Sequence, residues 1–246
     1  MDDISTVALS RMVAQQRALD VTAANIANSS TPGYHGERMI FSDWLSRQTA
    51  PGLPPGGREI AYTQDRATYR DTRPGPLTHT GNALDIAVGA EGYFSVQTPR
   101  GPRLTRAGHF ELSATGSIVD ADNNALLDTK GKPMQVGPTD GTLTITGDGS
   151  ISSAAGPVGR IGIVTPADPQ SLKAEGSRLF DAGGPTKPVA NPKITQGVIE
   201  ESNVLPSMEL NRMMNELREF QYTSQFIQSE ADRQQQAIEK ITQKGA

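Results

Sequence analysis

The chain has 246 residues, no cysteine and a formal net charge of −4. The lack of cysteine excludes disulfides, thiolate metal sites and cysteine nucleophiles, and the acidic balance lacks the basic excess that nucleic-acid binding requires. Aromatic residues make up only 5%, while 25 glycines and 17 prolines supply turn formers. This composition favours a modest core with many tight connections and predicts no nucleic-acid partner.

The first segment, from about residue 3 to 28, has the apolar spacing of an amphipathic helix. The helix is expected to end before Pro32, because proline disfavours a helical conformation at Thr31 and Gly33 suits a turn. The predicted apolar stripe is thin, since small and polar residues interrupt it. Its members follow at spacings of four or three: Ile4, Ala8, Met12, Gln15, Leu19, Thr22 and Ile26.

Residues 35–59 are expected to form a connector with an extended loop, because a Pro/Gly-rich run covers 51–57. From residue 60 to 202, apolar and polar residues alternate and turn signals recur. This pattern predicts an inserted antiparallel β domain, as a meander, sandwich or barrel. The expected strands occupy residues 84–88, 93–96, 103–106, 109–112, 117–119, 125–127, 143–145 and 150–151.

The last segment, 203–246, carries a heptad-type seam that predicts a long coiled-coil-like helix. Asn203 is expected to cap its N-terminus, with Pro206 in the first turn, where a missing N–H costs little. The seam alternates steps of three and four through Leu210, Met213, Leu217, Phe220, Ser224, Ile227, Ala231, Gln234, Ile238 and Ile241.

Taken together, the segments predict an α+β chain in which helical ends, 1–34 and 203–246, pair as a coiled-coil-like domain around the inserted β domain. A narrow amphipathic helix is marginal in water, because its stability comes mainly from packing its stripe. Neighbouring copies are therefore expected to complete the burial, and a contact between different patches propagates as a filament. The heptad spacing by itself is equally typical of a coiled-coil hairpin within a monomer.

No catalytic, cofactor or metal site is expected, so the chain is not predicted to be an enzyme. His35, His79 and His109 lack metal-ligand spacing and are expected to be structural. Asp120–Asn124 resembles half a calcium loop, but the glycine and the bidentate glutamate of such a loop are missing, so an Asx-rich hairpin turn is expected. The pair Glu200–Glu201 is expected to be solvated.

The N-terminus is acidic where a signal peptide is basic, and no apolar run reaches the ~20 residues that a membrane-spanning helix needs. We therefore expect no direct insertion into a membrane. A location outside the cytoplasm would require export without a cleaved signal.

Residues 18–34 resemble the signature of the bacterial flagellar rod and hook axial family, with Leu-Asp-Val, Asn-Ile-Ala-Asn and Thr-Pro-Gly-Tyr in order. Three further stretches, 80–88, 104–110 and 196–204, agree with that family in family order. The positions that carry the resemblance most directly are Asn25, Asn28, Thr31, Gly33, Tyr34, Gly81, Asn82, Asp85, Gln196, Gly197, Ser202 and Asn203.

The resemblance implies an inner helical domain built from both termini (1–34 and 203–246), an outer β domain (60–202) and unprocessed export through the flagellar type III apparatus. It also implies polymerisation with copies of itself and with other rod proteins into the drive shaft that crosses the periplasm. Length and motif order are most similar to the proximal-rod branch, with a distal-rod or hook-type subunit as the alternative. Arg11-Met12 and His35 depart from the usual family residues. A β-domain adaptor or chaperone that binds a single helical partner remains the alternative from a different class.

Overall fold

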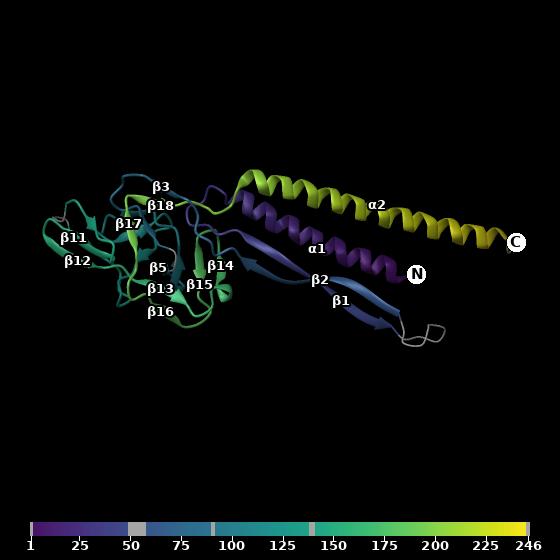
Figure 1. Ribbon diagram of the computed structural model, residues 1–246, viewed down its shortest axis with the longest axis horizontal. Helices are drawn as coiled ribbons and strands as arrows, with labels where there is room; N and C mark the ends of the chain where they lie inside the picture. Colours follow the sequence, from purple (N-terminus) through teal and green to yellow (C-terminus); the bar gives the residue numbers. More distant parts are fainter. Residues whose placement is uncertain (1, 49–57, 90–91, 138–140, 245–246) are drawn as a thin grey trace. The chain divides into compact units, whose positions relative to one another are not determined.

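The computed structural model describes the backbone of residues 2–48, 58–89, 92–137 and 141–244; within these, the side chains of 2–4, 41–48, 58–67 and 241–244 are not covered. The chain divides into two compact units. The helical unit contains Met1–Ile26, Glu37–Tyr69 and Pro206–Ala246, and the β unit contains Ala27–Gly36 and Arg70–Leu205. The predicted α+β class is confirmed, with the two terminal helices packed together and an antiparallel β-rich region between them in sequence (Figure 1).

The helical unit is built on α1, Asp2–Ala27, and the longer α2, Pro206–Lys244. The two helices run in opposite directions beside each other (Figure 1). Pro206 is the first residue of α2, where its fixed φ suits a helix and its missing N–H leaves no bond unmade. Asn203 does not cap this helix as predicted; its side chain has other partners, given below.

Two strands complete the helical unit. β1, Glu37–Gln48, pairs with β2, Arg58–Arg70, in a two-stranded sheet. β1 therefore lies in the segment expected to be a connector, and β2 lies mostly in the helical unit, although the β domain was expected to begin at residue 60. The Pro/Gly run, 51–57, lies outside the described residues. A strand depends on its partner's backbone as much as on its own pattern, so a single stretch of sequence indicates it weakly.

The β unit contains a nine-stranded sheet whose main path has the order β14-β15-β6-β5-β9-β8-β7, with β13 joining β5 to β16. Smaller sheets are β10-β11-β12, β17-β4 and β18-β3. Their described pairings are antiparallel. The bounds are β3 Leu77–His79, β4 Ile86–Val88, β5 Tyr93–Thr98, β6 Gly101–Thr105, β7 Phe110–Leu112, β8 Ile118–Asp120, β9 Ala125–Leu126, β10 Thr144–Ile145, β11 Ser150–Ser153, β12 Gly156–Arg160, β13 Ile163–Pro166, β14 Lys173–Glu175, β15 Leu179–Asp181, β16 Thr186–Pro188, β17 Ile194–Gln196 and β18 Val198–Glu200, with a short 3-10 helix η1 at Pro169–Ser171.

The eight strands expected from alternating polarity coincide with β4 to β11. The turn at Asp120–Asn124 is the Asx-rich hairpin that was expected, because the Asp120 carboxylate accepts the backbone N–H groups of Asp122 at 3.0 Å and Asn124 at 2.8 Å. Asn123 adopts a positive φ of 65° in this turn. The carboxylate therefore holds the turn's own backbone.

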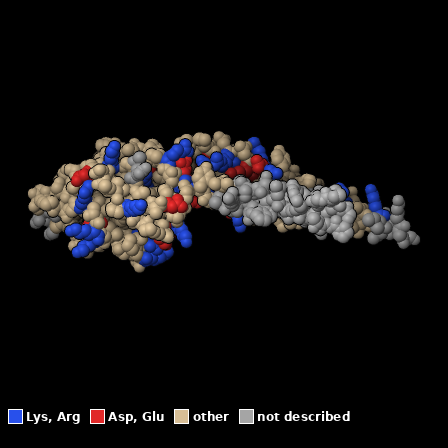
Figure 2. All heavy atoms as spheres, turned by 60° about the horizontal axis from the view of Figure 1, so that its bottom comes forward, with Lys and Arg blue, Asp and Glu red and all other residues tan. Residues whose placement is uncertain are grey.

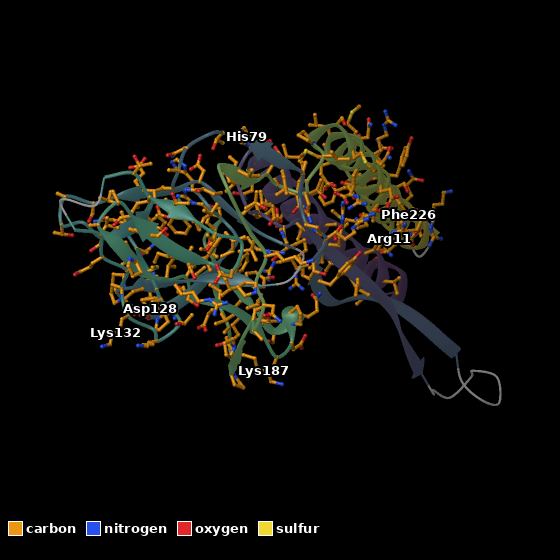
Figure 3. The ribbon with its side chains drawn as sticks, turned by 60° about the vertical axis from the view of Figure 1, so that its left-hand side comes forward. Arg11, His79, Asp128, Lys132, Lys187 and Phe226 are labelled. Carbon is orange, nitrogen blue, oxygen red and sulfur yellow. The ribbon has the colours of Figure 1, made fainter. Side chains whose placement is uncertain are left out.

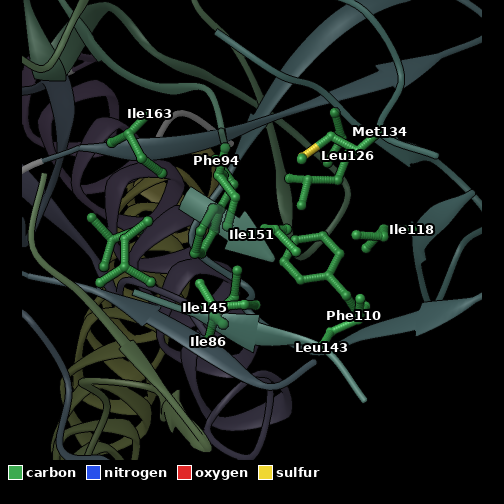
Figure 4. Packing of buried hydrophobic residues seen from close by; sticks show 14 of the residues in the cluster. Ile86, Phe94, Phe110, Ile118, Leu126, Met134, Leu143, Ile145, Ile151 and Ile163 are labelled. Atoms are coloured by element: carbon green, nitrogen blue, oxygen red, sulfur yellow. The ribbon is translucent and has the colours of Figure 1, made fainter. Parts of the chain in front are cut away.

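A continuous apolar core stabilises the β unit by itself (Figure 4). Phe94 and Phe110 lie edge to face at its centre, with ring centroids 5.4 Å apart. Aliphatic side chains from β4, β8, β9, β11 and β13 surround them: Ile86, Ile118, Leu126, Ile151 and Ile163. All members of this cluster belong to the β unit, so its core is built without side chains from the helices.

The helical unit is different. Among its described side chains, the buried ones are small or polar: Ala8, Ala14, Gln15, Ala18, Thr22, Asn25 and Glu209. No large hydrophobic side chain in that part of the structure is buried. Since apolar burial is the main favourable term in folding, this unit is weakly stabilised within one chain.

Candidate functional site

The surface between α1 and α2 is a polar seam. Thr22 donates a hydrogen bond of 2.9 Å from its Oγ1 to Oε2 of Glu216, and Asn25 approaches Oε2 of Glu209 at 3.4 Å. Arg11 and Glu219 come within 4.0 Å at the exposed edge of the same interface; Arg11 is labelled in Figure 3. Polar contacts therefore join α1 and α2 where an apolar seam was expected.

The residues of the predicted seam on α2 differ in their burial. Its Met213, Phe220 and Ile227 are half-buried, whereas Leu210 and Leu217 are exposed. Ala231 and Ile238 are also exposed, and the side chain of Ile241 lies outside the described residues. The helix instead turns the row one position earlier in each heptad toward α1: Glu209, Glu216, Thr223 and Glu230.

Polar partners explain why the row of Glu209 faces α1. Glu209 is fully buried, and its Oε1 forms a salt bridge of 2.8 Å with Nη1 of Arg38 on β1. A leucine in its place would leave Asn25 and Arg38 without their carboxylate, and unpaired buried polar groups are costly. Burial raises the pKa of Glu216 above its usual value, more than the Thr22 hydrogen bond lowers it.

On α1 the predicted stripe is rotated slightly. Ala8 and the polar residues Gln15 and Thr22 are buried as the stripe requires, while Met12, Leu19 and Ile26 are only half-buried. The side chain of Ile4 lies outside the described residues. The positions just before Leu19 and Ile26, namely Ala18 and Asn25, are the buried ones.

Asn25, a motif residue, has a structural role that its residue type explains. Its Oδ1 accepts the backbone N–H of Glu37 at 2.9 Å, and its Nδ2 donates to the Glu37 carbonyl at 2.8 Å. One amide side chain thus makes both hydrogen bonds that a neighbouring strand would make. An aspartate could not donate the second bond, so the pairing is specific for an amide.

The turn that follows α1 is held by its own motif residues. Thr31 donates its backbone N–H to the Asn28 carbonyl at 3.1 Å, and the Tyr34 N–H returns to the Thr31 carbonyl at 3.2 Å. Gly33 has a φ of +70°, and a Cβ there would lie 2.4 Å from the Ala107 backbone nitrogen. Only glycine fits this position.

A second buried carboxylate, Glu200, lies where three segments of the β unit meet, a place that we call the junction: 33–36, 71–75 and 200–203. Its Oε1 is 2.9 Å from Nε2 of His35 and accepts the Gly75 N–H at 3.1 Å, and its Oε2 is 3.7 Å from Nε of Arg106. The prediction that this glutamate is solvated is wrong, since it is 1% exposed. Burial alone would raise its pKa, but the His35 hydrogen bond, the Arg106 charge and the Gly75 amide together hold the pKa below its usual value.

Asn203 closes the same junction. Its Oδ1 accepts the Gly36 N–H at 2.8 Å, and its Nδ2 donates to the carbonyls of Asp71 at 2.9 Å and Arg73 at 2.8 Å. The buried Ser202 next to it accepts the Val204 N–H at 3.2 Å. Three segments, 33–36, 71–75 and 200–203, are therefore joined within the β unit by residues from its two ends.

The remaining motif residues form a separate cluster around β4 and β17. The Asp85 carboxylate lies 2.6 Å from Nδ1 of His109 and accepts from the Asn82 amide at 3.3 Å. Gln196 donates to the Ala83 and Leu143 carbonyls at 2.8 and 3.0 Å. Gly81 and Gly197 adopt φ of +75° and +74°, where Thr80 donates its N–H to the Gly197 carbonyl at 2.8 Å. Each of these residues makes hydrogen bonds that hold neighbouring segments of the β unit together.

Other chemistry was searched in the described part of the chain. It holds no group of three His, Cys, Asp or Glu side chains able to bind a metal ion, and none of its helices is apolar enough over a sufficient length to cross a bilayer. On the face of the β unit seen in Figure 2, Lys and Arg are scattered among uncharged residues and form no continuous stripe. The chain thus combines a β unit that has its own apolar core with a helical unit that leaves apolar side chains exposed, which fits the class of structural proteins that assemble.

Comparison with known proteins gives the family. The sequence profile described as "Flagella basal body rod protein" matches residues 6–35, and that described as "Flagellar hook protein FlgE/F/G D1 domain" matches residues 87–168. The flagellar basal-body rod protein FlgF of Caulobacter vibrioides is 32% identical over 98% of each chain, and FlgF of Mesorhizobium japonicum is 30% identical over 99% of this chain and 100% of its own. FlgG of Bacillus subtilis is 33% identical over 86% of this chain and 89% of its own. The chain belongs to the flagellar basal-body rod protein family.

Proposed function

We propose that this chain is a structural subunit of the proximal rod of the bacterial flagellum, of the FlgF type. In this role it polymerises with copies of itself and with other axial proteins into the shaft that carries torque across the periplasm. It reaches that place through the flagellar type III export apparatus without a cleaved signal peptide, and it has no catalytic role, cofactor or nucleic-acid partner.

The observation that carries the proposal is the contrast between the two units. The β unit buries its own large apolar side chains, whereas the helical unit leaves such side chains exposed along α2. Full burial of one of them stabilises by roughly 1.5–3 kcal/mol, so neighbours that cover several supply much of the stability that the single chain lacks. Near full-length similarity to FlgF proteins supports the flagellar rod as the assembly that this chain joins.

A complementation experiment tests the proposal and separates it from a distal-rod role. The gene is expressed in flagellated strains that lack FlgF or FlgG, and isolated basal bodies are probed for the chain. We expect incorporation and restored swimming in the strain without FlgF. Restoration only in the strain without FlgG would assign the distal rod, and a soluble complex of closed stoichiometry in place of rods would favour the adaptor alternative.

A further inference from the structure

Two separate apolar patches remain uncovered on α2. We name the first the 210 patch, consisting of Leu210, Met214 and Leu217, which are 50%, 52% and 43% exposed. The second, the 222 patch, consists of Tyr222 and Phe226, which are 69% and 50% exposed. Phe226 is labelled on α2 in Figure 3. Neither patch has a counterpart in the described part of this chain that would cover it.

The patches lie on opposite flanks of the helix. At 3.6 residues per turn, each residue advances about 100° around the axis. Measured from the row that faces α1, centred on Glu216 and Phe220, the 210 patch is turned by about 110° in one direction and the 222 patch by about 120° in the other. A copy placed beside α2 on one flank thus meets a different patch from a copy placed on the other flank.

The patches also lie at different heights along α2. Tyr222 follows Met214 by eight residues, and Phe226 follows Leu217 by nine. With a rise of 1.5 Å per residue, a parallel copy shifted by about 12 Å brings the 222 patch of one chain against the 210 patch of the next.

Charge agrees with this shift. Asp232 lies on the same flank as the 210 patch, and Lys240 lies on the same flank as the 222 patch, again eight residues apart. Both are exposed. The shift that pairs the aromatic patch with the aliphatic one therefore also places a lysine opposite an aspartate.

We propose that the partner of α2 is the α2 of a second copy of this chain, packed in parallel, shifted by about eight residues, with the 222 patch on the 210 patch. Because the two surfaces differ, the contact is heterologous and leaves one free patch at each end, so it propagates without closing. The proposal rests on the proposed function and adds to it the surfaces and the stagger of neighbouring subunits.

The absence of cysteine makes a cross-linking test direct. The full-length Met214→Cys/Tyr222→Cys chain is oxidised while assembled, together with the two single variants. The double variant is expected to form a ladder of covalent multimers, while each single variant stays monomeric. A matched control pairs Tyr222→Cys with Leu77→Cys, because Leu77 is similarly exposed at 58% but lies on β3. This control is expected to give no ladder.

Charge reversal gives an independent readout. Asp232→Lys should weaken self-association about two- to five-fold per contact, as loss of an exposed ion pair does, and adding Lys240→Asp to the same chain should restore it. Sedimentation velocity measures the association. Both side chains are exposed, so folding is not expected to change.

The outcomes separate this contact from the proposed function. Dimers from either single cysteine variant would show a symmetric contact and overturn the proposal. Incorporation into rods without a ladder from the double variant would also overturn it, while leaving the rod function intact. Failure of the chain to associate with itself or to enter rods would overturn both.

Discussion

The buried carboxylate of Glu200 gives the sharpest test of how the β unit is held together. Glu200→Gln keeps an oxygen that can accept a hydrogen bond from His35 or Gly75, but removes the charge opposite Arg106, which is itself buried. A buried charge that loses its counter-ion costs roughly 3–5 kcal/mol. Arg106 keeps its hydrogen bond of 3.1 Å to the Gly89 carbonyl, so we expect the low end, a loss of about 3 kcal/mol.

Urea unfolding, monitored by far-ultraviolet circular dichroism, measures this loss of stability. With an m-value of about 2 kcal/mol/M, the midpoint of the β unit should fall by about 1.5 M. Glu201→Gln is the matched control, because it is the next residue and is more exposed. Its free energy of unfolding should change by less than about 0.5 kcal/mol.

The pH dependence supplies a second criterion. The folded-state pKa of Glu200 lies below its unfolded value, so its stabilisation is present above the unfolded pKa and is lost as the pH falls through the folded pKa. Glu200→Gln should therefore lose less stability than the unsubstituted chain when the pH is lowered below about 4.3, the ordinary value for glutamate. Equal midpoints for the Glu200 and Glu201 variants, or an unchanged acid dependence in Glu200→Gln, would refute the role assigned to this carboxylate.

Three further predictions concern the turn after α1 and the contacts of the helical unit. Gly33→Ala should lower the free energy of unfolding of the β unit by more than about 3 kcal/mol, because it adds a close backbone contact at a strained φ. Gly131→Ala is the control: its φ is +76° but the space around it is open, so it should lower that free energy by only about 1 kcal/mol, and thermal unfolding compares the two variants. Asn25→Ala should lower the free energy of unfolding of the helical unit by about 1–3 kcal/mol and accelerate hydrogen exchange of the Glu37 amide. Unchanged exchange of that amide would contradict the hydrogen bonds between Asn25 and the Glu37 backbone. Because the folded pKa of Glu216 is raised, helix pairing should strengthen as the pH falls through that pKa, and Glu216→Gln should show the stronger pairing at neutral pH in a helicity titration.

The β unit could be predicted from the sequence because its signals are local. Alternating polarity and turn residues mark β4 to β11, and the Asx turn at Asp120–Asn124 follows from one carboxylate and the N–H groups beside it. Such elements are stabilised by residues that lie close together along the chain.

The buried polar contacts of Glu209 with Asn25 and Arg38 could not be predicted in the same way. Spacing identifies α2 and its shared row of Met213, Phe220 and Ile227, but either adjacent row could complete a heptad seam. The choice of Glu209 depends on Asn25 and Arg38, which are more than 170 positions away. No local pattern in a single sequence carries that information.

Amide hydrogen exchange of α1 and α2 in the full-length chain, before and after incorporation into rods, tests most directly whether neighbouring subunits complete the helical unit. We predict weak protection of both helices in the dilute chain and strong protection in the rod, with β4 to β6 strongly protected in both states. Strong protection of both helices in an isolated, monodisperse chain, with no increase on assembly, would contradict the account.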